Sequence, residues 1–164
     1  MIQSSVLPAE VHVAPEIEAR FEDLLATCHR TLPVVDEAML RQAFRVAVWA
    51  HRDMTRASGE PYVTHPLEVA RIYAEEMAMD DVSVAAALLH DVIEDTDVTL
   101  AFLRDTFGDT LAHLVDGLTK IGSVAPAREG GQAENVRKLM LSMAQDIRVI
   151  LVKFADRLHN MRTL

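Results

Sequence analysis

Residues 82–95 read VSVAAALLHDVIED and carry the strongest structural signal in the chain. The first eight are almost all apolar and include neither glycine nor proline, which favours a helix that is buried on several sides. Four ionisable residues then follow within six positions: His90, Asp91, Glu94 and Asp95. We therefore expect one continuous helix whose polar end carries chemistry.

The spacing of these four residues would place them together on such a helix. His90 and Glu94 are four apart, as are Asp91 and Asp95, so all four would project from adjoining strips. Carboxylates at the end of a buried helix are costly unless they are paired, hydrated or bound to a cation. The helix dipole also disfavours negative charge at a C-terminal end. A divalent cation would relieve both costs, but a solvated helix end with a hydrogen-bonded histidine explains this segment equally well when it is taken alone.

The helical pattern extends over most of the chain, and no alternating run of useful length predicts a strand. We expect an all-α protein of seven to eight helices, with residues 1–15 as a flexible arm and residues 16–164 as one domain. Residues 121–133 contain glycines and a proline and are predicted to form a loop. Asp36 is the predicted N-cap of its helix, and Pro66 the predicted first residue of another. The expected helices are Glu16–Thr31, Asp36–Met54, Pro66–Ala78, one from Asp80 or Asp81 to Asp95, Leu100–Phe107, Thr110–Lys120, Glu134–Ala144 and Ile147–Met161.

The composition narrows the class of protein. The chain has 164 residues, which fits one domain with a sizeable core. The net charge of -9 argues against general nucleic-acid binding, although a cation and a few local basic side chains could still bind a phosphorylated small molecule. Cys28 is the only cysteine, which excludes an internal disulfide and suits a reducing compartment such as the cytoplasm. We find no signal peptide and no membrane-spanning run of about 18 apolar residues.

Two further segments place candidate side chains. Residues 56–66, RASGEPYVTHP, put His65 after a turn and next to a helix start. Residues 153–160, KFADRLHN, put Asp156 and Asn160 four apart on one helix face. Taken alone, the first is better explained as an ordinary histidine at a helix start and the second as a solvated charged stripe.

The order of these residues nevertheless resembles the H…HD…D arrangement of the HD superfamily. The match implies that the metal ligands are His65, His90, Asp91 and Asp156. Two imidazoles and two carboxylates suit manganese, iron or zinc better than calcium. Four ligands would leave room for water if the metal takes five or six positions.

The flanking sequences make the resemblance more specific. Four blocks, in this order, are similar to the hydrolase domain of the RelA/SpoT homologue family, and the similarity covers roughly residues 36–164. The blocks are SGEPYVTHP (58–66), LHDVIEDT (89–96), DGLTK (116–120) and FADRLHNMRTL (154–164). Such domains are guanosine-3′,5′-bis(diphosphate) 3′-pyrophosphohydrolases, which act in the stringent response. They use one Mn²⁺ to hydrolyse the alarmones (p)ppGpp to GDP or GTP and pyrophosphate.

The resemblance also implies roles for residues around the metal. Glu94 and Asp95 match the acidic pair that handles the attacking water, and Glu94 is the expected general base. Residues expected to bind the substrate are Arg56, Ser58, Asn160, Thr163, Lys153 and Arg157. For Lys153, a surface salt bridge is the preferred alternative. The pattern does not use His51 or His159 as ligands, so we expect them to pack or to form hydrogen bonds.

Two departures from the family pattern bear on function. Ala57 stands where members often carry lysine, and Met54-Thr55 where they often carry Gly-Gln, which affects nucleotide affinity more than metal binding. The sequence stops at Leu164, soon after the last motif. We therefore expect an N-terminal fragment that lacks further hydrolase helices, has reduced or no activity, and is joined to a synthetase domain in a longer parent. The alternatives are an HD phosphohydrolase for another nucleotide and a regulatory HD domain of a bifunctional alarmone synthetase/hydrolase.

Overall fold

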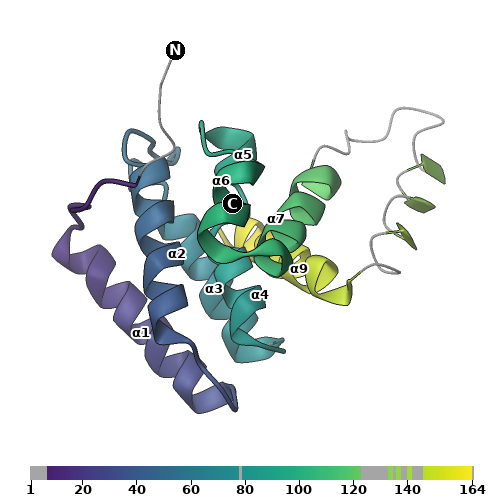
Figure 1. Ribbon diagram of the computed structural model, residues 1–164, viewed down its shortest axis with the longest axis horizontal. Coiled ribbons are helices and arrows are strands. Elements are labelled where there is room, and N and C mark those ends of the chain that lie inside the picture. Colours follow the sequence, from purple (N-terminus) through teal and green to yellow (C-terminus); the bar gives the residue numbers. More distant parts are fainter. Residues whose placement is uncertain are drawn as a thin grey trace.

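The regular structure of the chain is helical. The computed structural model describes residues 7–77, 79–122, 133–134, 136–137, 140–141 and 146–163. Among these described residues, the helices with both ends described are α1 Pro15–Thr31, α2 Glu37–Ala50, α3 Thr64–Glu76, α4 Asp81–Leu88, α5 Val92–Asp95, α6 Leu100–Phe107, α7 Asp109–Gly122 and α9 Ile147–Arg162 (Figure 1). An isolated bridge joins Thr55 and Pro61, and the described residues form no strand. The prediction of an all-α fold is confirmed.

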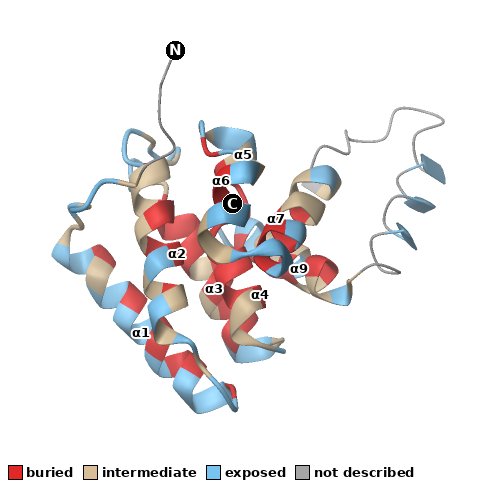
Figure 2. Ribbon diagram, viewed as in Figure 1, coloured by how far each residue is buried: buried red, intermediate tan, exposed pale blue. Residues whose placement is uncertain are grey.

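Helix α4 lies at the centre of the fold. Its residues Ser83–Leu88 are fully buried, and the helix packs against α2, α3, α7 and α9. Figure 2 shows the buried sides of the surrounding helices turned toward the interior. Because α4 is apolar around nearly its whole circumference, this central position buries all its side chains from Ser83 to Leu88. The residues that follow α4 therefore start from inside the core.

The prediction of one helix over residues 82–95 is wrong. The structure has α4, a turn over residues 89–91, and the separate short helix α5. In this turn the backbone N–H groups of His90 and Val92 bond to carbonyl groups three residues back, at 3.4 and 3.2 Å. This bonding is tighter than the four-residue spacing of an α-helix.

The turn is the place where the side chains of two consecutive residues meet. His90 Nε2 lies 3.0 Å from Asp91 Oδ2. The sequence doublet is therefore a pair of converging side chains at the end of the central helix, and α5 begins directly after it.

The ends of α2 and α3 differ slightly from expectation. Asp36 caps α2 as predicted, since its carboxylate accepts the N–H of Met39 at 3.0 Å. The helix ends at Ala50 instead of Met54, because the chain turns over residues 51–53. Helix α3 begins two residues before Pro66. Proline is tolerated in this first turn because the N–H groups there have no partner within the helix.

The ends of the other helices complete the comparison. Gly108 separates α6 from α7 with a φ of 93°, a left-handed conformation that favours glycine. Helix α7 runs to Gly122 and Ala133 is helical, so the predicted loop does not include residues 121, 122 and 133, and residues 123–132 lie outside the described residues. Of the predicted helix Glu134–Ala144, residues 134, 136, 137, 140 and 141 are described and are helical.

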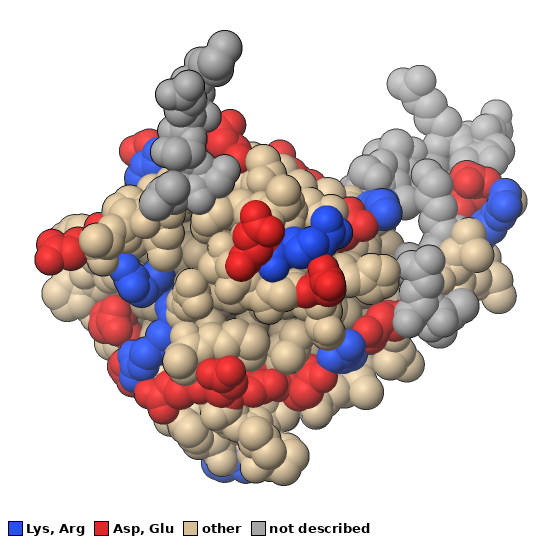
Figure 3. Space-filling view, in the orientation of Figure 1, with Lys and Arg blue, Asp and Glu red and all other residues tan. Residues whose placement is uncertain are grey.

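The N-terminal segment is described from residue 7. Residues 7–14 precede α1 without forming a helix, and the predicted arm over residues 1–6 lies outside the described part. The carbonyl oxygen of Ala9 accepts a hydrogen bond from Arg45 Nη2 at 2.9 Å. No helix in the described part is long and apolar enough to cross a membrane. Figure 3 shows acidic and basic side chains interleaved on one face of the molecule, with a band of acidic groups across it.

One guanidinium group joins the starts of α4 and α9. The carboxylate of Asp80 caps α4 by accepting the N–H of Ser83 at 2.9 Å. Arg148 Nη1 donates to the same carboxylate at 2.5 Å, and Arg148 also pairs with Asp146, the N-cap of α9. Asp80 therefore caps the start of the central helix α4 and also contacts α9, the helix that carries Asp156.

We expect Asp80→Ala to lower the free energy of unfolding by about 1–2 kcal/mol, because it removes an N-cap and leaves Arg148 with one carboxylate partner. Urea denaturation would measure the change. Asp105→Ala is the control, since Asp105 is an exposed residue of α6 that caps no helix start. Equal stability of Asp80→Ala and the wild type would contradict the capping role.

Candidate metal centre

A tight turn places His65 at the start of α3. The N–H of Arg56 bonds to the carbonyl of Glu60 at 2.8 Å, and the N–H of Tyr62 bonds to the carbonyl of Met54 at 3.0 Å. Gly59 takes a φ of 89° inside this turn, which suits a residue without a Cβ. The turn thereby delivers His65 to the core as a buried residue.

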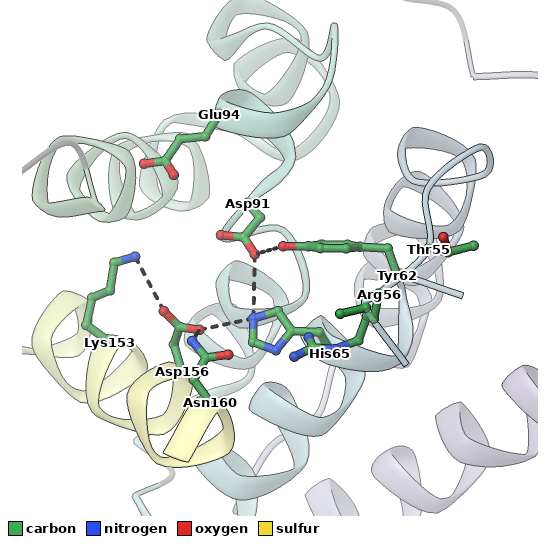
Figure 4. Close-up of a pocket in the computed structure, with 10 residues that line it drawn as sticks. Thr55, Arg56, Tyr62, His65, Asp91, Glu94, Lys153, Asp156 and Asn160 are labelled. Atoms are coloured by element: carbon green, nitrogen blue, oxygen red, sulfur yellow. Dashed lines mark hydrogen bonds and ion pairs between the residues drawn. The ribbon is translucent and has the colours of Figure 1, made fainter. Parts of the chain in front are cut away.

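The four predicted ligands come together from three parts of the chain. His65 comes from α3, His90 and Asp91 from the turn after α4, and Asp156 from α9. Asp156 Oδ1 lies 3.0 Å from His65 Nε2 and 3.6 Å from His90 Nε2. Asp91 Oδ2 lies 3.0 Å from His90 Nε2 and 3.6 Å from His65 Nε2. Figure 4 shows His65, Asp91 and Asp156 pointing toward one another. The juxtaposition is observed, and the role of these residues as ligands stays a prediction.

The donor atoms fit a cation. His90 Nδ1 lies 2.7 Å from the carbonyl oxygen of Ala87, to which only a protonated nitrogen can donate. The Nε2 atom of neutral His90 is then an acceptor that faces the oxygens of Asp91 and Asp156, and it is a buried nitrogen without a hydrogen-bond partner. Acceptors that face one another need a positive charge between them. A divalent metal supplies it, and the mixed nitrogen and oxygen set suits a transition metal.

The pKa values of His90, Asp91 and Asp156 also indicate a site that favours positive charge. Burial alone would lower the pKa of His90, but the carboxylates of Asp91 and Asp156 raise it. Burial alone would raise the pKa of Asp91 and of Asp156, but the neighbouring histidines hold both below the ordinary range. The site therefore stabilises positive charge, which a proton supplies in the absence of a metal.

A cavity of about 430 Å³ opens beside these residues. The side chains that line it are Thr55, Arg56, Ala57, Tyr62, His65, Asp91, Glu94, Lys153, Asp156 and Asn160 (Figure 4). Lys153 Nζ lies 3.6 Å from Asp156 Oδ2, and Asn160 Nδ2 donates to Asp156 Oδ1 at 3.2 Å. Lys153 thus forms an ion pair, as the preferred alternative expected, but its side chain is only 16% exposed and also lines the cavity.

Glu94 reaches this cavity from α5 instead of from a continuous helix. Burial, opposed by the charge of Lys153, raises the pKa of Glu94 above its ordinary value. Asp95 is absent from the cavity wall and instead lies 3.2 Å from the hydroxyl of Tyr62. Of the acidic pair, only Glu94 therefore lines the cavity.

A second cavity of about 440 Å³ adjoins the first. Arg56 and Ala57 line both, and the predicted substrate residues Ser58 and Thr163 line the second together with His159. Arg157 is exposed and lines neither cavity. Of the predicted substrate residues, Arg157 alone is not brought to these two cavities.

Tyr62 is a site residue that the sequence reasoning missed. Its hydroxyl donates to Asp91 Oδ2 at 2.8 Å, and burial with two neighbouring carboxylates raises the pKa of Tyr62 so that it stays neutral. Its ring stacks on His51, with centroids 4.8 Å apart. The sequence did offer one indication of this role, because Tyr62 lies three residues before His65 on a rigid turn.

We expect Tyr62→Phe to weaken Mn²⁺ binding by about 10–100-fold, because the hydroxyl holds a carboxylate that faces the candidate metal position. Titration of the purified protein with Mn²⁺, followed by electron paramagnetic resonance, would measure this. Tyr73→Phe is the matched control, since its hydroxyl donates to Ser83 Oγ in the core at 2.6 Å. Equal affinities of Tyr62→Phe and the control would rule out the role of the hydroxyl.

His51 and His159 behave as expected for groups outside the ligand set. His51 Nδ1 bonds to the carbonyl of Ala47 at 2.9 Å. His159 Nδ1 lies 2.8 Å from His65 Nδ1, within hydrogen-bond distance. The prediction that both histidines pack or form hydrogen bonds is confirmed.

Comparisons with known proteins agree with this geometry. The HD domain family matches residues 43–164. The chain belongs to the HD domain family. This HD domain is 50% identical over 145 residues to the bifunctional (p)ppGpp synthase/hydrolase SpoT of Escherichia coli K12, covering 88% of this chain and 20% of that protein. It is 48% identical over 143 residues to the GTP pyrophosphokinase rsh of Brucella melitensis biotype 1, covering 87% of this chain and 19% of that protein.

A solved structure extends the comparison to three dimensions. A metazoan SpoT orthologue, described as hydrolysing ppGpp, matches with a TM-score of 0.61 and 29% identity, over 79% of this chain and 71% of its own. The similarity to the RelA/SpoT homologue family is thereby confirmed. The chain spans about one fifth of the length of the SpoT and rsh relatives.

Proposed function

We propose that this HD domain is a Mn²⁺-dependent pyrophosphohydrolase that removes the 3′-pyrophosphate from (p)ppGpp. One observation carries the proposal: two imidazole nitrogens lie 3.0–3.6 Å from two carboxylate oxygens, beside a cavity that is also lined by acidic and basic side chains. The described activities of SpoT from E. coli and of the metazoan orthologue support the choice of substrate.

His65, His90, Asp91 and Asp156 would hold the Mn²⁺. A bound divalent cation polarises a phosphoryl oxygen and lowers the pKa of a coordinated water. The protein contributes a fixed arrangement of these four side chains from three segments. Tyr62 keeps Asp91 in place through its hydroxyl.

Glu94 is the general base in this proposal. It takes a proton from the attacking water while the water oxygen bonds to the phosphorus next to the ribose. The bond from that phosphorus to the ribose 3′ oxygen breaks, the oxygen takes up a proton, and pyrophosphate leaves. Partial burial raises the pKa of Glu94, which brings its basicity closer to neutral pH.

The basic and polar residues would bind the substrate. Lys153 and Asn160 contact Asp156 and face the first cavity, where the pyrophosphate would lie. Arg56 stands between the two cavities and can pair with phosphate or stack on a base, since guanidinium does both. Ser58 and Thr163 would contact the nucleoside in the second cavity.

The test is release of pyrophosphate from ppGpp by the purified 164-residue chain with Mn²⁺. We expect GDP and pyrophosphate in equal amounts, and no product when the Mn²⁺ is removed with EDTA. Parallel assays with ATP, GTP and dGTP test the alternative that the domain is an HD phosphohydrolase for another nucleotide. Turnover of one of these, with ppGpp untouched, would refute the proposed substrate.

Metal analysis of the purified protein tests the alternative that the domain is regulatory and not an enzyme. A purely regulatory HD domain has no need of a metal, so a protein that stays metal-free after incubation with Mn²⁺ would refute the enzymatic proposal. We further propose a cytoplasmic location, which the buried free thiol of Cys28 and an intracellular nucleotide substrate support. An attached synthetase domain in a longer parent stays a prediction.

A further inference from the structure

Helix α9 contacts His65 through two side chains. Asp156 Oδ1 lies 3.0 Å from Nε2 of the His65 ring, and His159 Nδ1 lies 2.8 Å from its Nδ1. His65 and His159 are both buried, with 3% and 8% of their surfaces exposed. Their rings stack at an interplanar angle of 25°. The imidazole of His65 is thus held at both nitrogens by residues one helical turn apart.

The contact between two Nδ1 atoms constrains where the protons lie. A hydrogen bond between them needs one protonated and one unprotonated nitrogen. Nε2 of His65 faces the two carboxylates, and it can bind a cation only through a free lone pair. The single proton of neutral His65 must then be on Nδ1, so His65 donates and His159 Nδ1 accepts. His159 in turn carries its own proton on Nε2.

We infer that His159 is a positioning residue for the cation site, which selects the His65 tautomer that binds metal and fixes the plane of its ring. The inference rests on the proposed cation site and adds to it a residue outside the ligand set. Histidine ligands commonly donate their second N–H to a fixed acceptor, and loss of that acceptor costs about 10–100-fold in metal affinity. Here the acceptor is a second imidazole, three residues beyond Asp156 on the same helix.

Two substitutions of His159 separate this role from packing. In His159→Asn the side-chain oxygen is attached to Cγ, as Nδ1 is, so it can accept the proton of His65. In His159→Gln the oxygen is one bond farther out and corresponds to Nε2, which leaves the acceptor position empty. Both variants replace an imidazole ring by a neutral amide, so both remove the ring's packing against α3.

The experiment is a Mn²⁺ titration of the wild type and both variants by electron paramagnetic resonance, with circular dichroism to compare their folds. We expect His159→Gln to bind about 10–100-fold more weakly than the wild type, and His159→Asn to stay close to it. In the Zn²⁺-loaded protein, ¹⁵N NMR should show a protonated Nδ1 on His65 that is protected from exchange in the wild type and in His159→Asn, but not in His159→Gln.

The outcomes distinguish this inference from the proposed function. A wild type that binds no Mn²⁺ refutes the cation site itself. A wild type that binds, with His159→Gln equally tight, leaves the cation site standing and overturns the role of His159. Equal weakening in both variants would show that His159 acts through packing alone, which also overturns the inference.

Discussion

Asp156→Ala is expected to weaken Mn²⁺ binding by more than about 100-fold, because the loss of a supporting residue outside the ligand set already costs about 10–100-fold. Asp156 Oδ1 is within 3.6 Å of both histidine Nε2 atoms, so its loss removes the one carboxylate that α9 contributes to the cation position. It also frees Lys153 and Asn160, both of which contact this carboxylate.

Isothermal titration with Mn²⁺ would measure the effect of Asp156→Ala. The control is Asp109→Ala, which removes a carboxylate that is 89% exposed at the start of α7. A variant with near wild-type affinity would mean that the cation is held by His65, His90 and Asp91 alone. Those three residues do have donor atoms within 4.8 Å of one another, so the measurement decides between three and four protein ligands.

Glu94→Gln is expected to lower kcat by about 10²–10⁴-fold, which is the usual contribution of a general base. Glutamine keeps the size of the side chain and removes its capacity to take a proton. Because no hydrogen bond or ion pair among the described residues joins Glu94 to the four ligand candidates, Mn²⁺ affinity should stay close to that of the wild type. Parallel measurement of ppGpp turnover and Mn²⁺ binding checks both halves of this expectation.

Glu76→Gln at the exposed end of α3 is the control for Glu94→Gln. Loss of Mn²⁺ along with turnover would make Glu94 a ligand instead of the base. Unchanged turnover with Mn²⁺ still bound would move the base elsewhere, and Asp95, held near the Tyr62 hydroxyl, would be the first residue to test.

Much of the fold follows from local sequence patterns. The apolar residues 82–89 predict a central helix, and Asp36 predicts the start of α2 through its capping carboxylate. The break at His90 was not predictable from period or propensity, because no glycine or proline marks it. The break coincides with a tertiary arrangement, because His90 and Asp91 approach each other and side chains of α3 and α9 at this turn.

Only some residues of the candidate site could likewise be predicted from the sequence. The four ligand candidates could be predicted from the sequence because histidine and aspartate are common metal ligands, and here they occur in the order that the HD superfamily uses. Tyr62 was missed because a tyrosine beside a turn is equally compatible with packing, and only its 2.8 Å contact to Asp91 distinguishes it. The role of Arg157 stays a prediction: it is adjacent to Asp156 in sequence but lines neither cavity, because consecutive residues on a helix point in different directions.

The placement of Asp156 on the last described helix has a consequence for biosynthesis. As the chain leaves the ribosome, His65, His90 and Asp91 emerge long before Asp156. In the proposed site, all four ligands can meet only after α9 has been made and has docked against α3, α4 and α7. On that proposal, tight binding of the cation requires a completed fold, and a nascent or partly unfolded molecule that already contained His65, His90 and Asp91 would bind manganese poorly.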